Sequence, residues 1–268
     1  MDNALGENRF YIKYELDGLD IVPSWGKPGE CSLHWFGLTS GRFWIETPAG
    51  NLLEYTAAIQ ELWSPGPHPD YYVARPFEDL VSILPAILEP VPADIATRIA
   101  DARWRAKAEQ WCDSAKDGER WDQWYAASRW WYDRCLDMGY LKHAPRFTFW
   151  CVQEKLFFQW QADDKESGVP VWTLPEGQVS IDAPAFETAV TRFCEELLGD
   201  MEQKVRSIQQ NGWKRTDCVL NVEALVHEQA ARREFFQKKR TEHHTTDWQK
   251  VRDSLDAVTP MISRADQG

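Results

Sequence analysis

Residues 33–46, LHWFGLTSGRFWIE, decide the fold prediction for this chain. Two aromatic runs flank Thr39-Ser40-Gly41, and apolar and polar side chains alternate within both runs. Alternation around a short turn of Thr, Ser and Gly predicts a β-hairpin. The same alternation directs one set of side chains into the protein core, namely Leu33, Trp35, Phe43 and Ile45.

The opposite face of this predicted hairpin mixes aromatic and charged side chains, namely His34, Phe36, Arg42, Trp44 and Glu46. Such a mixture is typical of a protein-binding hot spot, or of a platform that stacks on sugar rings. The alternative is that a further layer of structure covers this face. We extend the candidate partner-binding surface into the proline-rich loop at 64–72, adding His68, Asp70 and Tyr71.

The rest of the chain divides into four sections. An N-terminal β-rich section spans 9–75 and a helical section spans 76–139, followed by a second β section at 146–182 and a C-terminal helical section at 184–258. The first two sections contain these further expected elements: strands at 10–16, 51–56 and 70–74, and helices at 77–88, 92–114 and 119–138, the last ended by Gly139.

The second half of the chain opens with a hairpin at 147–161 that is apolar on both faces, which predicts a central position covered on two sides. Short strands are expected at 169–173 and 178–181. Three amphipathic helices should follow: 186–208 closing at Gly212, 222–236 capped by Asn221, and a last helix whose start at 246–249 fits a capping box.

Strands, helices, strands and helices in this order predict an α+β fold, with antiparallel sheets built from aromatic hairpins and amphipathic helices packed over them. The 268 residues can bury a large core, and we predict a single domain over residues 1–268. Whether the two β sections join into one sheet is left open by the sequence. Most of the 15 tryptophans lie on amphipathic stripes and are expected to be core residues.

The formal net charge of −12 argues against non-specific binding to nucleic acid or to an anionic membrane. Residues 1–90 hold 13 acidic and 5 basic side chains, a net −8, so this third of the chain would attract a basic partner. One basic run at 232–240 is better explained by pairing with the acidic surface than by phosphate binding.

Six cysteines lie far apart without a Cys-x-x-Cys pair, which is typical of reduced thiols in a cytoplasmic protein and not of a disulfide framework. The first nine residues show no secretory signal, and no apolar run reaches the roughly 18 residues of a membrane-spanning helix. We therefore expect a cytoplasmic protein that does not enter the membrane.

The sequence lacks complete motifs for catalysis, for metal binding and for cofactor binding. His227-Glu228-Gln229-Ala230-Ala231 begins like a zinc-binding helix, but Ala231 stands where the second histidine is needed. His243-His244 has no further ligand at suitable spacing, and no phosphate-binding loop, dinucleotide fingerprint or nucleophile elbow occurs. We predict no metal, no cofactor and no catalytic residue, and leave enzymatic activity open.

Several segments together resemble an uncharacterised bacterial family that is named only as a domain of unknown function. They include Val22-Pro23-Ser24-Trp25-Gly26, the 33–44 motif, Asp70-Tyr71-Tyr72-Val73-Ala74-Arg75, Pro170-Val171-Trp172 and Thr246-Asp247-Trp248. The resemblance runs from near residue 10 to near residue 258 and favours one domain. It transfers no functional residues. By analogy of type, such acidic bacterial proteins are often immunity partners of interbacterial toxins.

Two functions are therefore expected. The first is a non-enzymatic immunity protein that binds and neutralises a basic toxin through the surface defined above. The alternative is a carbohydrate- or small-ligand-binding protein, or an enzyme with an unfamiliar site in which His34 and Glu46 act as acid and base. A phage-defence role would leave the same sequence features.

Overall fold

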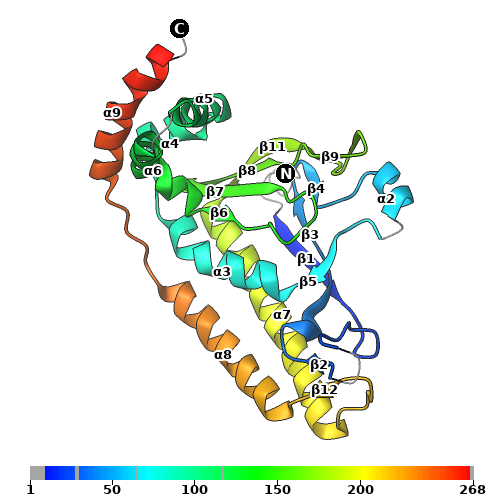
Figure 1. Ribbon diagram of the computed structural model, residues 1–268. Coiled ribbons are helices and arrows are strands. Elements are labelled where there is room, and N and C mark those ends of the chain that lie inside the picture. The colour runs from blue at the N-terminus through cyan, green and yellow to red at the C-terminus, as the bar shows by residue number, and fades with distance from the viewer. Residues whose placement is uncertain (1–9, 28–29, 64–65, 116–117, 266–268) are drawn as a thin grey trace, which may run out of the picture.

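The computed structural model describes residues 10–27, 30–63, 66–115 and 118–265 and shows an α+β protein, as predicted (Figure 1). The two β sections form separate antiparallel sheets. The first sheet contains β1 (Tyr11–Leu16), β3 (Ser40–Thr47), β4 (Gly50–Leu52) and β5 (Asp70–Tyr72). The second contains β6 (Cys135–Leu136), β7 (Arg146–Val152), β8 (Lys155–Gln161) and β11 (Glu176–Asp182).

The prediction of a hairpin at 33–46 is wrong. Leu33 is the last residue of the short strand β2 (Ser32–Leu33), and the chain then turns into the 3-10 helix η1 (Gly37–Thr39), where Leu38 N donates to His34 O at 3.1 Å. Its second half is β3, which pairs with β1 on one side and with β4 and β5 on the other. The inward set was nevertheless predicted correctly, since Leu33, Trp35, Phe43 and Ile45 are all buried.

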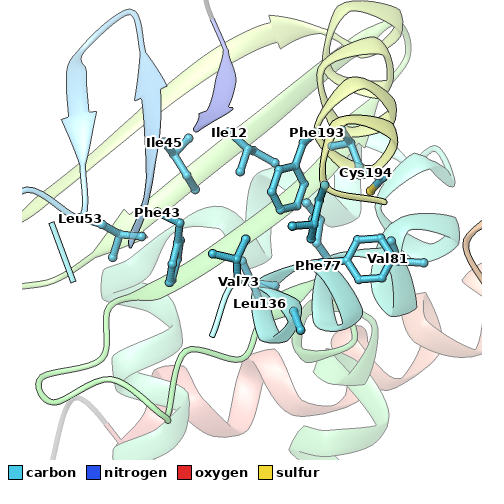
Figure 2. Packing of buried hydrophobic residues seen from close by; sticks show 14 of the residues in the cluster. Ile12, Phe43, Ile45, Leu53, Val73, Phe77, Val81, Leu136, Phe193 and Cys194 are labelled. Atoms are coloured by element: carbon cyan, nitrogen blue, oxygen red, sulfur yellow. The ribbon is translucent and has the colours of Figure 1, made fainter. Parts of the chain in front are cut away.

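Helix α7 (Ala183–Asn211) packs on the inner face of the first sheet through β1, and α3 (Ala74–Leu88) packs on β6 and β7 of the second sheet within the same core. Figure 2 shows Phe43 of the first sheet near Val73, which precedes α3, and Phe193 of α7 beside Ile12. These apolar side chains belong to the main hydrophobic core. Their burial fixes which side of the first sheet is left for solvent.

The hairpin at 147–161 is confirmed as β7 and β8. Phe149 stacks on Phe158 at 4.4 Å in the main core, whereas Trp150 points to the other side and packs on Trp131 at 4.9 Å. That second side faces a smaller core built by α4 (Ala93–Ala100), α5 (Ala102–Asp113), α6 (Glu119–Tyr132) and α9 (Trp248–Ala265). The predicted two-sided burial of this hairpin is therefore confirmed.

The helical boundaries differ from the prediction in three places. The expected helix at 92–114 breaks at Asp101, whose carboxylate caps α5 by accepting from the backbone N–H groups of Arg103 and Trp104. The helix expected at 119–138 ends at Tyr132, and Gly139 is not its terminator, because Cys135 and Leu136 pair with β7. Helix α2 (Ala57–Trp63) was not predicted.

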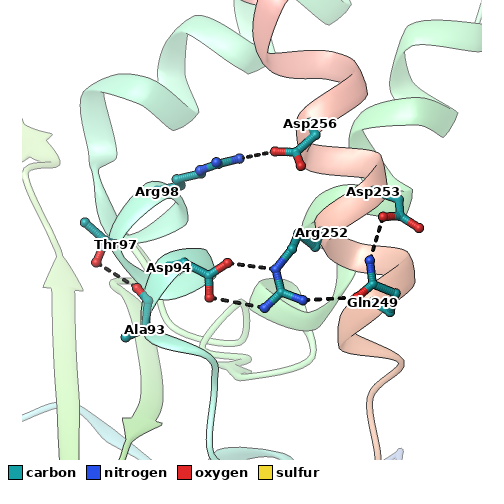
Figure 3. Close-up of polar contacts among 8 residues, drawn as sticks. All are labelled: Ala93, Asp94, Thr97, Arg98, Gln249, Arg252, Asp253 and Asp256. Atoms are coloured by element: carbon teal, nitrogen blue, oxygen red, sulfur yellow. Dashed lines mark hydrogen bonds and ion pairs between the residues drawn. The ribbon is translucent and has the colours of Figure 1, made fainter.

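The C-terminal helices follow the prediction more closely. Helix α7 ends before Gly212, which has a φ of 72°, and Asn221 caps α8 (Val222–Thr241) by accepting from Ala224 N. The capping box at 246–249 does not form, because Asp247 caps α9 and Thr246 instead bonds to Glu89. Figure 3 shows α9 tied to α4 by ion pairs from Arg252 and Arg98.

The remaining strands are short. Residues 165–170 form a small ribbon of β9 (Lys165–Glu166) and β10 (Val169–Pro170), so the strand expected at 169–173 is only partly present. The strand expected at 51–56 ends at Leu52, and the one at 70–74 ends at Tyr72 before α3 begins. Strand β12 (Val219–Leu220) pairs with β2 in parallel.

Candidate functional site

The side of the first sheet opposite to α7 carries the candidate surface. We call it the outer face and define it by Tyr11, Lys13 and Glu15 of β1, Arg42, Trp44 and Glu46 of β3, and Asp70 and Tyr72 of β5. The register brings them together, because Lys13 lies opposite Trp44, Glu15 opposite Arg42, and Arg42 opposite Asp70. Directly opposed residues in an antiparallel sheet project to the same side.

The outer face is open to solvent. Tyr11 is 40% exposed, and the side chains of Arg42 and Glu15 are 45% and 66% exposed. Trp44 and Glu46 are half-buried. Within the described parts of the chain, α7 contacts β1 from the inner side, where Tyr14 Oη donates to Asp200, so α7 does not cover the outer face.

The loop before β5 reaches the outer face, as the sequence suggested. The His68 ring stacks on Trp44, with centroids 4.4 Å apart and an interplanar angle of 8°, and His68 Nδ1 lies 3.0 Å from Leu53 O. Asp70 follows on β5 beside Arg42. Ser64 and Pro65 of the predicted loop lie outside the described residues.

Charge on the outer face is arranged around one guanidinium group. Arg42 Nη1 lies 3.8 Å from Glu15 Oε2, and Arg42 also faces Asp70 across the strand pair. Desolvation and then the Asp17 carboxylate raise the pKa of Asp70, while Arg42 opposes this shift. Glu15 and Asp70 thus flank Arg42, and Asp17 adds a third carboxylate near Asp70.

Aromatic rings gather at the end of the first sheet where β3 begins and β5 ends. We call this group the aromatic corner and define it by Trp25, His34, Phe36 and Tyr72. Trp25 contacts His34 at 4.4 Å and Tyr72 at 5.1 Å between ring centroids, and Phe36 contacts Tyr72 at 5.2 Å. Trp25 Nε1 donates to Tyr72 Oη at 2.5 Å. Because Tyr72 belongs to both groups, the corner continues the outer face.

Most of the predicted surface residues are thus brought together. Arg42, Trp44, Glu46, His68 and Asp70 lie on or against the outer face, while His34 and Phe36 reach it from a turn and not from a paired strand.

Tyr71 and the His34–Glu46 pair are the exceptions. Tyr71 lies opposite Gly41, is half-buried against the core and stacks on Tyr140 at 4.6 Å, so it does not share this surface. His34 and Glu46 do not share a pocket either. The corner meets β3 at Ser40, and six residues at 3.3 Å each put Glu46 about 20 Å along the strand.

Five residues of this surface were not named from the sequence, namely Tyr11, Lys13, Glu15, Trp25 and Tyr72. The alternation of the strand at 10–16 contained a signal for the first three, since residues 11, 13 and 15 must share a face. No local pattern links Trp25 to Tyr72. Their contact exists only because the chain folds back over the end of the sheet.

Groups of three or more His, Cys, Asp or Glu side chains able to hold a metal ion do not occur among the described residues. Likewise, none of the described helices combines the length and apolar character required to cross a membrane.

Among known proteins, this chain matches one family and no curated protein or solved structure. A family described only as a family of unknown function, DUF5984, matches residues 11–254 and thus nearly the whole sequence. This agrees with the resemblance seen in the sequence motifs, and the protein therefore belongs to the DUF5984 family.

Proposed function

We propose that this protein is a non-enzymatic inhibitor that binds and neutralises a basic protein toxin, as an immunity protein does. One observation carries the proposal. The outer face and the aromatic corner form a continuous surface that combines aromatic rings with carboxylates, and the Tyr11, Glu15 and Arg42 side chains on it are exposed. Trp25 at the corner is 38% exposed.

This composition suits a protein partner with lysine and arginine side chains. Their charged ends can bond to Glu15 and Asp70, while their aliphatic stems pack on Trp25 and Tyr72. Aromatic side chains supply much of the binding energy in protein interfaces. The net charge of −8 over residues 1–90 would accelerate the encounter with a basic partner.

Small-ligand binding is a weaker candidate. The separation of His34 from Glu46 removes the acid–base pair that the enzymatic version of this alternative required. The remaining support for small-ligand binding is the general ability of exposed tryptophan to stack on sugar rings. A protein interface uses both the aromatic and the acidic members of the surface.

The test is binding to the toxins encoded beside this gene, measured by co-purification and by surface plasmon resonance. Trp25→Ala should weaken the complex by about 30-fold, the effect of losing a hot-spot residue of about 2 kcal/mol. Trp121→Ala is the matched control, because Trp121 is 40% exposed but lies on α6, away from the first sheet. Thermal unfolding should show that both variants are folded.

A second variant separates charge from shape. Glu15→Lys combined with Asp70→Lys should slow association and flatten its dependence on salt, whereas the exposed Asp163→Lys should not. The proposal would be overturned if the protein formed a complex with none of the neighbouring toxins. Normal binding by both the Trp25 and the double charge variants would also overturn it.

A further inference from the structure

Cys31 and Cys218 lie side by side although 187 positions separate them in the sequence. Strands β2 and β12 pair in parallel, with Val219 opposite Ser32 and Leu220 opposite Leu33 (Figure 1). One residue earlier on both strands, the same register places Cys218 opposite Cys31. Cys31 takes part in this pairing through its backbone, because Val219 N donates to Cys31 O at 2.7 Å.

This arrangement meets the backbone requirement of a disulfide. Paired strands lie about 4.8 Å apart, and the Cα atoms of a disulfide are usually 4.4–6.8 Å apart. Residues in register on parallel strands project to the same side of the ribbon. Both thiols are free in the structure, and rotation about the two Cα–Cβ bonds can turn the sulfur atoms toward each other.

The two thiols differ in accessibility in a way that sets the order of reaction. Cys31 is half-exposed, and its Sγ lies 3.2 Å from Lys27 O, so a reagent in solution can reach it. Cys218 is only 6% exposed. Burial raises the pKa of the Cys218 thiol, and the nearby Arg215 guanidinium opposes that shift and favours the thiolate.

The other four cysteines are poorer candidates for oxidation. Cys112, Cys151 and Cys194 are buried, and burial raises the pKa of the Cys112 thiol to about 11 and that of the Cys151 thiol to about 12. Cys135 is half-buried and contacts Trp131 O and Thr148 Oγ1. Thiolates are the reactive species, so these sites should react slowly.

We propose that Cys31 and Cys218 form a reversible disulfide with a low-molecular-weight disulfide, such as oxidised glutathione, as the electron acceptor. The Cys31 thiolate attacks this disulfide, forms a mixed disulfide and releases one small thiolate. The Cys218 thiolate then attacks Cys31 Sγ, forms the internal bond and releases the second small thiolate. The protein loses two electrons and two protons, and one small disulfide becomes two small thiols.

The bond would add a covalent link between two parts of the chain that the β2–β12 pairing and the hydrogen bonds of Arg215 to Leu19 O and Val22 O already hold together. Cys31 precedes His34 of the aromatic corner, and Ser32 pairs with Trp25 through an isolated bridge. Cys218 belongs to the connection between α7 and α8. Oxidation would thus fasten the segment that presents the corner to the connection that follows α7.

The test uses the folded, reduced protein incubated with oxidised glutathione. Remaining thiols are blocked with N-ethylmaleimide, and peptides are mapped by mass spectrometry without reduction. We expect a peptide that links Cys31 to Cys218 and that disappears after treatment with dithiothreitol. The oxidised protein should also unfold at a higher urea concentration than the reduced one, because the bond constrains the unfolded chain.

Cys31→Ser should abolish the linked peptide, and Cys135→Ser, which removes the other half-buried thiol, should leave it unchanged. Peptide mapping of the unaltered protein decides the proposal even if a serine variant does not fold. A Cys31–glutathione adduct that persists while Cys218 stays free would overturn it. So would recovery of both cysteines as free thiols.

Discussion

Asp79 on α3 shows how a single partly buried residue can make the stability of this protein depend on pH. Its Oδ2 lies 2.9 Å from Arg75 Nε, and Arg75 also bonds to Asp137 at 3.2 Å. Burial raises the pKa of Asp79 to about 6; Arg75 opposes the shift, and the Asp137 and Glu78 carboxylates add to it. The folded protein therefore holds this proton at a higher pH than the unfolded chain does.

Because the folded-state pKa is the higher one, the Asp79 contribution to stability falls as pH rises from about 4 to about 6. Between about pH 5 and about pH 7.5, the free energy of unfolding should fall by on the order of 1 kcal/mol relative to Asp79→Asn. Urea denaturation of both proteins at the two pH values measures this. Asp163→Asn, at an exposed site, should not change the pH dependence, and a difference of opposite sign would refute the assignment.

Glu89 is a second residue whose removal has a predictable cost. It accepts from Arg134 Nη2, Thr246 N and Thr246 Oγ1, each at 2.6 Å, and the Arg134 side chain is fully buried. Glu89→Ala leaves that guanidinium without its counter-charge and should cost about 3–5 kcal/mol in urea denaturation.

The double variant Glu89→Ala with Arg134→Met removes both charges and should be less destabilised than Glu89→Ala alone. Glu195→Ala removes an exposed carboxylate that lies 3.6 Å from Arg240, and should stay within about 0.5 kcal/mol of the unaltered protein. A Glu89→Ala effect no larger than this control would contradict the role assigned to the buried pair.

At the scale of the element, local patterns predicted strands and their faces better than their partners. The β7–β8 hairpin was predictable because its two strands are adjacent in sequence and a turn at 153–154 joins them. Strand β3 pairs instead with β1, which lies earlier in the chain, and no local pattern encodes that choice. Phe43 and Ile45 were still assigned to the core, since alternation along one strand does not depend on its neighbour.

Gly41 was predicted to lie in a turn but lies in β3, where it allows β1 to approach closely. A substitution at this position tests that role. A Cβ atom at this position would collide with the backbone oxygen of Glu15 and approach Leu16 Cα to 2.9 Å, so β1 and β3 need glycine to meet. Gly41→Ala should destabilise the protein by about 1–3 kcal/mol or more, as overpacking does.

Gly199→Ala is the matched control on α7, where a new Cβ meets no atom within 4 Å. It should stabilise the protein by about 0.5–1 kcal/mol, because alanine favours helix over glycine. Thermal and urea unfolding of both variants provide the comparison. Equal stability of the two would show that β1 can move away from β3 without cost.

At the scale of the whole molecule, the candidate surface was predictable only in part. Arg42 and Trp44 share a face because one strand carries them, and this much follows from period-two alternation. The position of His68 on Trp44, and of Trp25 on Tyr72, depends on where distant segments cross the sheet. Tertiary crossings of this kind have no signature in a single sequence.

Strand β7 contributes side chains to both hydrophobic cores, and this predicts how the molecule unfolds. Strand β7 places Phe149 in the main core and Trp150 in the smaller core, which α9 completes with fully buried Leu255. Leu255→Ala should cost about 2–5 kcal/mol, the usual effect of truncating a buried leucine. Because β7 cannot lose one core without weakening the other, tryptophan fluorescence and far-ultraviolet circular dichroism should report one coincident transition.

Met261→Ala, at a partly exposed position on the same helix, should leave stability within about 0.5 kcal/mol. An early, separate transition in the Leu255 variant would show that the helical core unfolds independently of the sheet.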